Sequence, residues 1–176
     1  MQIEKYTVEQ FLFLPEEKRV EMMAIYNLVV FDIDCKTWTF EAVKETQYQL
    51  KRPLDYKTMI EIVGRQIDGS LFDIDAHVFF GTFNGIAKSI LEITDIENNA
   101  LGHTPTGDEM IASEEVGGFE SFGYLPELDR LANGDILKYD EIKKLSWSEC
   151  FSKLAYDSRQ SRYQNKLIEL MHKKND

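Results

Sequence analysis

The sequence predicts a mainly α-helical protein, a multi-helix bundle with a long irregular excursion near residues 95–118. Apolar residues recur at spacings of three and four through most of the chain, as is typical of amphipathic helices. Capping patterns precede several of these segments, and no alternation of strands and helices is present that could build a parallel sheet. With 176 residues, 43% of them hydrophobic, the chain is predicted to form a single domain over 1–176. It would have helical parts over 7–94 and 119–173.

The first third of the chain is predicted to be helical. Thr7, with Gln10 three residues later, forms a capping-box pattern. An amphipathic segment over 40–50 and a helix capped by Asp55 follow further along. Between the capping box and the segment over 40–50, a helix is predicted over 15–30, because apolar residues recur there at helical spacing: Val20, Met23, Ala24, Leu28 and Phe31.

Residues 76–93 are the most apolar part of the chain and predict a central buried helix, with a pair of strands as the alternative. Gly81 and Gly85 each weaken this helix by about 1 kcal/mol. Because the two glycines are four residues apart, they lie on one face, where they permit another helix to approach closely.

The stretch over 95–118 differs in character from its surroundings. It is longer than an ordinary connection within a compact domain, so we expect an arm laid over the protein's own body or over a neighbouring subunit. A short hairpin within it is left open. The residues that interrupt its periodicity are Asn98, Asn99, Gly102, Pro105, Gly107, Gly117 and Gly118.

Two short helices are predicted to follow. The first, Leu125–Ala132, is closed by Asn133 and Gly134 in the manner of a C-cap. Asp135 can cap the second, Ile136–Leu145.

The final helix is predicted from Trp147 to about His172, with Ser146 and Glu149 as its capping box. The two ends of this helix are expected to face different neighbours, and residues 156–171 are predicted to contact another protein. The reason is a change of apolar stripe along the helix, from Trp147, Phe151 and Leu154 to Tyr156, Tyr163, Leu167 and Leu170.

Composition excludes several classes of function. Acidic residues outnumber basic ones by 31 to 20, for a net charge of −11, and no basic stripe that could follow a phosphate backbone is present. Direct nucleic-acid binding is therefore not expected. Cys35 and Cys150 form no CxxC pair, which indicates a reducing compartment. The chain shows no signal peptide and no membrane-spanning stretch, so we expect a soluble protein without membrane partners.

One motif suggests catalysis. The apolar run before Asp32 and Asp34 resembles the first motif of the haloacid-dehalogenase phosphohydrolases, and Gly134-Asp135 with Asp140 resembles their later acidic motif. The resemblance implies a nucleophile at Asp32, a general acid at Asp34 and Mg²⁺ between them. Both motifs, however, are predicted at helix ends, whereas the family places them at strand ends. We therefore reject this function as the first choice and keep it as an alternative.

Other chemical motifs are missing. The histidines, His77, His103 and His172, have no neighbourhood typical of zinc or di-iron sites, and no nucleophile elbow, Walker loop or dinucleotide-binding turn occurs. We assign no catalytic, cofactor-binding or metal-binding residue and no cofactor.

A family resemblance points elsewhere. The run Leu131–Ile142, leading into Leu145–Glu149 and the last helix, resembles small helical proteins of tailed bacteriophages, and the opening Thr7–Lys18 is similar in style. These are virion components and tail-assembly chaperones. The resemblance implies a non-enzymatic protein that docks onto portal, tail or tape-measure partners in the host cytoplasm or the virion.

The expected function is therefore that of a protein-binding subunit of a phage-type assembly, in which a homo-oligomer or ring is compatible with the sequence. The predicted contact surfaces are residues 156–171 and the excursion over 95–118. An acidic, nucleic-acid-mimicking inhibitor of a host enzyme is the first alternative. A Mg²⁺-dependent phosphohydrolase using Asp32 and Asp34 is the second.

Overall fold

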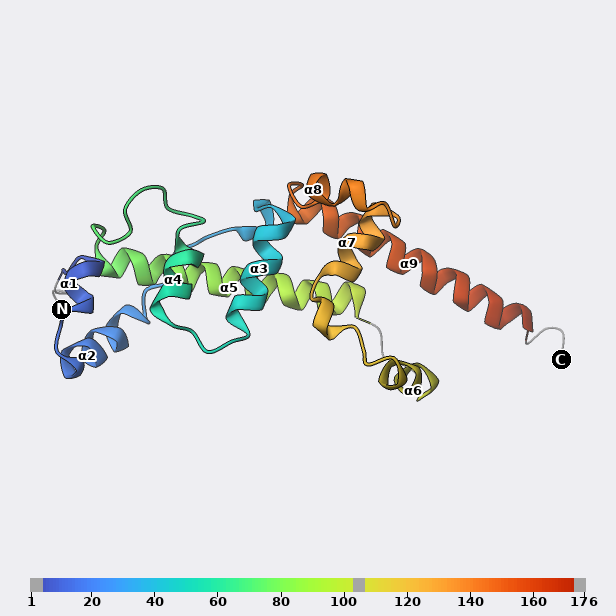
Figure 1. Ribbon diagram of the computed structural model, residues 1–176, viewed down its shortest axis with the longest axis horizontal. Helices are drawn as coiled ribbons and strands as arrows, with labels where there is room; N and C mark the ends of the chain where they lie inside the picture. Colours follow the sequence, from blue (N-terminus) through green and yellow to red (C-terminus); the bar gives the residue numbers. More distant parts are fainter. Residues whose placement is uncertain (1–4, 103–106, 173–176) are drawn as a thin grey trace. The chain divides into compact units, whose positions relative to one another are not determined.

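The computed structural model describes residues 5–102 and 107–172 and is mainly helical, as predicted (Figure 1). Its α-helices are α1 (Val8–Leu12), α2 (Glu16–Tyr26), α3 (Phe40–Leu50), α4 (Tyr56–Val63), α5 (Ala76–Leu101), α6 (Gly107–Glu115), α7 (Leu125–Ala132), α8 (Tyr139–Ile142) and α9 (Trp147–His172). Short 3₁₀ helices lie at η1 (Cys35–Thr37), η2 (Glu120–Phe122) and η3 (Ile136–Lys138).

The chain divides into two compact units. Unit 1 comprises residues 1–35 and 45–92, and unit 2 comprises residues 36–44 and 93–176. Helices α3 and α5 contribute residues to both units.

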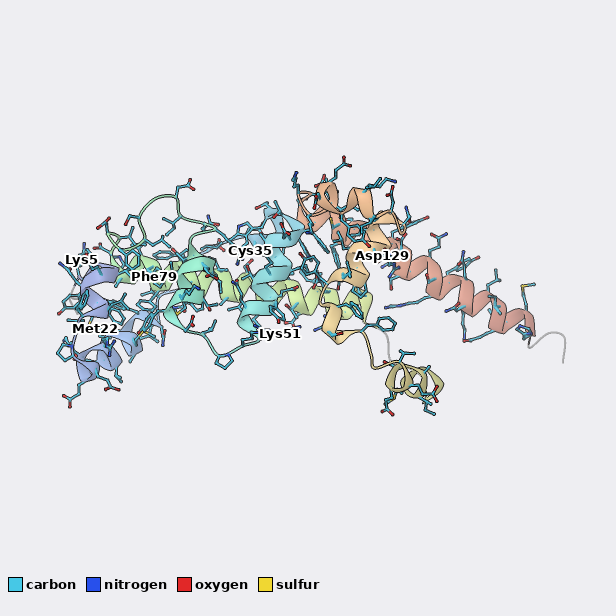
Figure 2. The ribbon with its side chains drawn as sticks, in the orientation of Figure 1. Lys5, Met22, Cys35, Lys51, Phe79 and Asp129 are labelled. Carbon is cyan, nitrogen blue, oxygen red and sulfur yellow. The ribbon has the colours of Figure 1, made fainter. Side chains whose placement is uncertain are left out.

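Unit 1 has an aromatic core in which α1, α2 and α5 meet. Phe11 packs edge-on against Phe80 with ring centroids 5.2 Å apart, and Tyr26 stacks on Phe80 at 5.6 Å. Met22 and Phe79 complete this buried cluster (Figure 2). Such ring pairs add stability beyond the burial of their area. The predicted capping box of α1 is confirmed, since Gln10 N donates to Thr7 Oγ1.

The segment after α2 corrects the helix predicted over 15–30. Helix α2 ends at Tyr26, and the chain then runs extended beside α5. Phe31 N donates to Gly81 O (3.1 Å), and Asn84 Nδ2 donates to Val29 O (2.8 Å). The backbone groups of this segment thus find partners on α5, so a further turn of helix is not needed to satisfy them.

The two glycines of α5 make that contact possible. A Cβ atom on Gly85 would lie 2.3 Å from Phe31 O, and one on Gly81 would lie 2.8 Å from Val29 Cγ1. The predicted close approach is therefore real, but an extended segment makes it and not a second helix. Residues 76–101 form one helix, which removes the strand-pair alternative.

Within unit 1, one arginine joins α4 to the second part of α3. Arg65 donates to Thr46 Oγ1 and Gln49 Oε1, both at 2.7 Å, and pairs with Glu45 at 2.9 Å. The predicted cap of α4 is confirmed, because Asp55 Oδ1 accepts from Thr58 N at 2.7 Å.

Unit 2 is built around the start of α9. Residues 36–44 pass beside it, and Thr39 forms an isolated antiparallel bridge with Ser146. Trp147 N donates to Trp38 O at 2.8 Å, and Phe40 packs edge-on against Tyr124. The capping box predicted at the start of α9 is confirmed, with Glu149 N donating to Ser146 Oγ at 3.3 Å.

The helix predicted over Ile136–Leu145 is shorter than expected. Helix α7 ends as predicted, with Asn133 in the left-handed region at φ 52°, but a 3₁₀ turn, η3, comes next and α8 spans only Tyr139–Ile142. Asp135 caps the 3₁₀ turn through Leu137 N (3.1 Å), and the side chains of Ile136 and Leu137 remain exposed.

Most of the stretch over 95–118 is helical, which differs from the predicted irregular excursion. Helix α5 continues to Leu101 because Ile93 is buried and the Glu97 carboxylate interacts with Lys44 and Trp147. Gly102 follows the helix, its N donating to Asn98 O. Helix α6 then covers 107–115, so the described part of the stretch contains no hairpin.

Candidate docking surface

The two acidic motifs lie apart from any strand. Asp32 and Asp34 belong to the extended segment of unit 1, whereas Asp135 caps a 3₁₀ turn of unit 2. Apart from two isolated bridges, residues 5–102 and 107–172 contain no strand, so none is present at 28–32. The strand-end geometry that the phosphohydrolase motif uses is therefore not formed by these residues.

His77 belongs to unit 1 and His172 to unit 2. His77 lies beside Asp75, with Nδ1 3.8 Å from Oδ2, and His172 is exposed at the end of α9. His103 lies outside the described residues. Within the described ranges, no group of three His, Cys, Asp or Glu side chains is placed to hold a metal ion.

Both cysteines are buried small side chains. Burial raises the pKa of Cys35 and of Cys150 to about 11, because the charged thiolate is poorly solvated there. A hydrogen bond with Ser89 opposes part of this shift at Cys35.

A buried charged cluster connects four helices within unit 2: α3, α5, α7 and α9. Lys44 Nζ lies 2.9 Å from Glu97 Oε1 and 2.6 Å from Glu127 Oε2, although the Lys44 side chain is only 6% exposed. Trp147 Nε1 donates to the same Glu97 oxygen at 2.7 Å. The ammonium group is thus neutralised by two carboxylates, and it contacts the face of the Phe40 ring at 5.6 Å. This arrangement positions the unit 2 parts of α3 and α5 together with α7 and α9.

Helix α9 has two halves of different character. Its buried residues are Trp147, Cys150, Leu154 and Ser158, which share one side of the helix. Beyond Ser158 that side continues with Ser161, Asn165 and Ile168, and burial stops, since Ile168 is 53% exposed. All residues of the outer half of α9 (residues 159–172) are exposed.

An apolar stripe runs along the opposite side of this helix. Helix α9 turns once every 3.6 residues, so the exposed apolar residues named below lie on one side of it, facing away from the buried residues. Tyr163 is 67% exposed and Leu167 is 45% exposed. Five exposed residues make up this surface, which we call the apolar stripe: Tyr156, Tyr163, Leu167, Leu170 and Met171.

One flank of the apolar stripe is basic. Arg159 and Lys166 lie on the helix surface next to the apolar stripe. Lys166 makes an exposed ion pair with Glu169 at 2.8 Å. Arg162 is farther round and is anchored, donating to Ala100 O (3.1 Å) and Gly102 O (2.8 Å).

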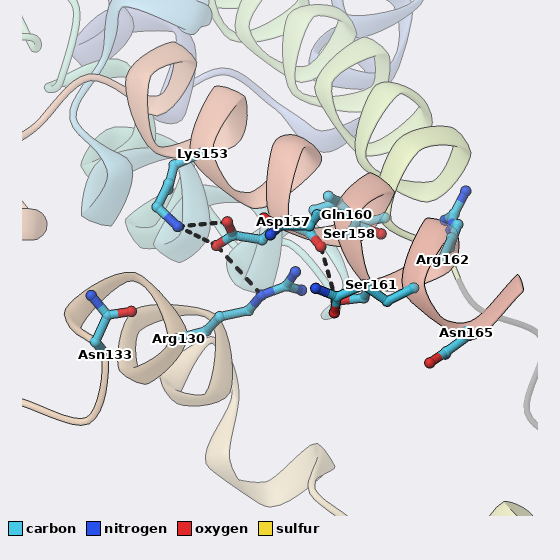
Figure 3. Close-up of a pocket in the computed structure, with 11 residues that line it drawn as sticks. Arg130, Asn133, Lys153, Asp157, Ser158, Gln160, Ser161, Arg162 and Asn165 are labelled. Carbon is cyan, nitrogen blue, oxygen red and sulfur yellow. Dashed lines mark hydrogen bonds and ion pairs between the residues drawn. The ribbon is translucent and has the colours of Figure 1, made fainter. Parts of the chain in front are cut away.

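A polar hollow of about 490 Å³ lies between α7 and α9 (Figure 3). Among its charged lining residues, Lys153 Nζ donates to Asp157 Oδ1 at 2.6 Å and Arg130 Nε lies 3.9 Å from Asp157 Oδ2, whereas Arg162 donates to main-chain carbonyls.

A second exposed apolar segment lies between α5 and α7. We call residues 107–122 the α6 segment. Every side chain of α6 that the structure describes is exposed, and Glu114 and Glu115 are the charged ones among these described side chains. The large apolar side chains of the segment are also exposed: Met110, Ile111, Val116, Phe119 and Phe122.

The sequence indicated the apolar stripe of α9, but it did not indicate that the α6 segment is helical and acidic. The predicted contact helix 156–171 coincides with the apolar stripe. The α6 segment fell inside the predicted excursion, yet its helix and its acidity were missed. The acidity could have been recognised from the sequence, because ten acidic residues and no lysine or arginine occur between Lys88 and Arg130.

No helix in the described part of the chain is both long enough and apolar enough to cross a membrane. Comparisons with protein-family models, with curated proteins and with solved structures found no match to this chain.

Proposed function

We propose that this chain is a non-enzymatic protein-binding subunit, a structural or assembly component of a phage-type virion, and that the apolar stripe of α9 is its docking element. The observation that carries the proposal is the exposure of five large apolar side chains along one side of α9. Exposed apolar patches of this kind mark sites of protein–protein contact.

The stripe is suited to insertion into a groove of a partner. Helix-in-groove recognition uses apolar anchors at spacings of three, four and seven, and Tyr156, Tyr163, Leu167 and Leu170 follow these spacings. Burial of each such side chain contributes about 1.5–3 kcal/mol. Tyrosine anchors suit an interface in addition, because the ring is apolar and the hydroxyl can find a hydrogen-bond partner.

The first turns of α9 are packed within unit 2, and this packing fixes the base of the helix. Trp147 is hydrogen-bonded to Glu97, and Cys150 and Leu154 are buried. The outer half therefore extends from a fixed base and does not have to form as an isolated helix, which at this length is only marginally stable.

The phage component of the proposal rests on the resemblance of residues 131–149 to small virion and tail-assembly proteins. It names portal, tail and tape-measure proteins as the partners to test.

The test measures binding of the purified chain to portal, tail and tape-measure proteins identified in the genome that encodes it, by isothermal titration calorimetry. In the test variant, Tyr163→Glu and Leu167→Glu place two charges on the apolar stripe. In the matched control, Ser161→Glu and Asn165→Glu place the same charges on the opposite side of the same half-helix.

We expect one of the three proteins to bind the wild type and the control equally. The test variant should bind that protein about 100-fold more weakly, as the loss of two buried anchors implies. Absence of binding to all three proteins, or equal weakening by both variants, would contradict the proposal.

A further inference from the structure

We propose that the outer half of α9 binds the α6 segment of a second copy of this chain, so that two copies exchange these helices reciprocally. The inference rests on the proposed function, because it uses the same docking helix and names a partner for it. Two exposed apolar surfaces of opposite charge, both in unit 2, carry it.

The α6 segment supplies an acidic apolar surface. It contains no lysine or arginine, and Glu114 and Glu115 are exposed on its helix. Met110 and Phe119 are 53% and 63% exposed. A nine-residue helix whose described side chains, residues 110–115, are all exposed has little to stabilise it in water, so covering its apolar side chains would stabilise the segment.

The outer half of α9 supplies the complementary basic surface. In a chain with a net charge of −11, residues 159–172 carry three basic residues and one acidic residue. Arg159 and Lys166 flank the apolar stripe on one side. Complementary charges across an interface favour one partner and exclude others.

A second copy explains the exposure better than the chain's own fold does. The described side chains of α6 and those of the outer half of α9 are exposed within one molecule, so neither surface covers the other there. Two copies related by a two-fold axis would form the same contact twice, with α6 of each copy on α9 of the other.

Pairing of two α9 helices with each other is less favourable. In an antiparallel pair related by a two-fold axis, Arg159 and Lys166 of both copies would lie on the same side of the contact, where like charges repel. The acidic α6 segment avoids that repulsion while it still covers the apolar stripe.

The experiment is a charge exchange, followed by sedimentation velocity over a wide range of protein concentration. One variant carries Arg159→Glu and Lys166→Glu, which makes the α9 flank acidic. A second variant carries Glu114→Lys and Glu115→Lys, which makes α6 basic. A control variant carries Lys57→Glu and Lys88→Glu, two exposed positions in unit 1.

Wild type and control are expected to approach twice the chain mass of 20.5 kDa as concentration rises. Each charge-reversed variant alone should remain monomeric, because its two surfaces then carry the same sign. An equimolar mixture of the two variants should recover the dimer, because each surface again meets its opposite.

Three results would overturn the inference: a wild type that is monomeric at every concentration, single variants that dimerise like the wild type, or a mixture that stays monomeric. A contact between α6 and α9 within one chain gives the first of these. None of them bears on binding to portal, tail or tape-measure proteins, which the calorimetric test decides separately.

Discussion

Gly85 is the position at which unit 1 tolerates a side chain least. Its Cβ would lie 2.3 Å from the carbonyl oxygen of Phe31 and 3.1 Å from the carbonyl carbon. Both are backbone atoms, so rotation of a side chain cannot relieve the contact. Gly85→Ala should therefore push the extended segment away from α5 and lengthen the hydrogen bond from Phe31 N to Gly81 O.

The expected loss of stability follows from three contributions. Overpacking a buried site costs about 1–3 kcal/mol, and the rigid backbone contact here favours the upper value. Loss of the hydrogen bond costs about 1 kcal/mol more. Alanine offsets about 1 kcal/mol through its higher helix propensity. The net destabilisation of Gly85→Ala is therefore about 3 kcal/mol.

Urea denaturation followed by far-ultraviolet circular dichroism measures this difference. Gly81→Ala is the matched control, because its Cβ would meet the ends of two side chains, Val29 Cγ1 at 2.8 Å and Phe31 Cζ at 3.0 Å. These atoms can move, so the control should stay within about 1 kcal/mol of the wild type, where the gain in helix propensity offsets mild crowding. If Gly85→Ala is as stable as Gly81→Ala, the segment does not pack on α5 as described.

Four further predictions concern buried groups and a cap. Lys44→Met should lower the free energy of unfolding by about 3 kcal/mol, because Glu97 is left buried without its cation, and chemical denaturation measures the loss. Cys35 and Cys150 should react with a thiol reagent at pH 8 only as fast as the protein opens, since burial raises the pKa of both to about 11. Because their pKa values are raised by folding from 9.0, the stability that these thiols contribute is complete below pH 9 and declines as pH rises through 11, which denaturation at several pH values detects. Thr7→Ala should cost about 1 kcal/mol through loss of the N-cap of α1, visible as a lower Tm.

Much of the local structure could be predicted because it depends on neighbours in the chain. Thr7, Asp55 and Ser146 start their helices as expected, since each cap bonds a backbone N–H three residues away. Asn133 closes α7 for the same kind of local reason.

The candidate site could be predicted in part. The change of stripe along α9 separates a buried side from an exposed one, and the structure confirms that the first side is buried up to Ser158 and that Tyr163 and Leu167 are exposed. The excursion over 95–118 was predicted as a contact surface, but the helix within it was missed because Gly107, Gly117 and Gly118 are typical of loops; Gly107 in fact begins α6, and the other two glycines follow it.

The sequence by itself determined that the protein is helical, where most helices begin, and that the last helix carries an apolar stripe pointing away from its packed side. The tertiary structure alone decided that α2 ends at Tyr26, that the Asp32 segment runs extended on the glycines of α5, and that Lys44 is buried between two carboxylates. These outcomes depend on partners roughly 50 residues or more away, such as Gly81 for Phe31 and Glu97 for Lys44. Helical spacing describes only the nearest turns of the chain, whereas a backbone hydrogen bond or a buried charge is satisfied by whichever group the fold brings to it.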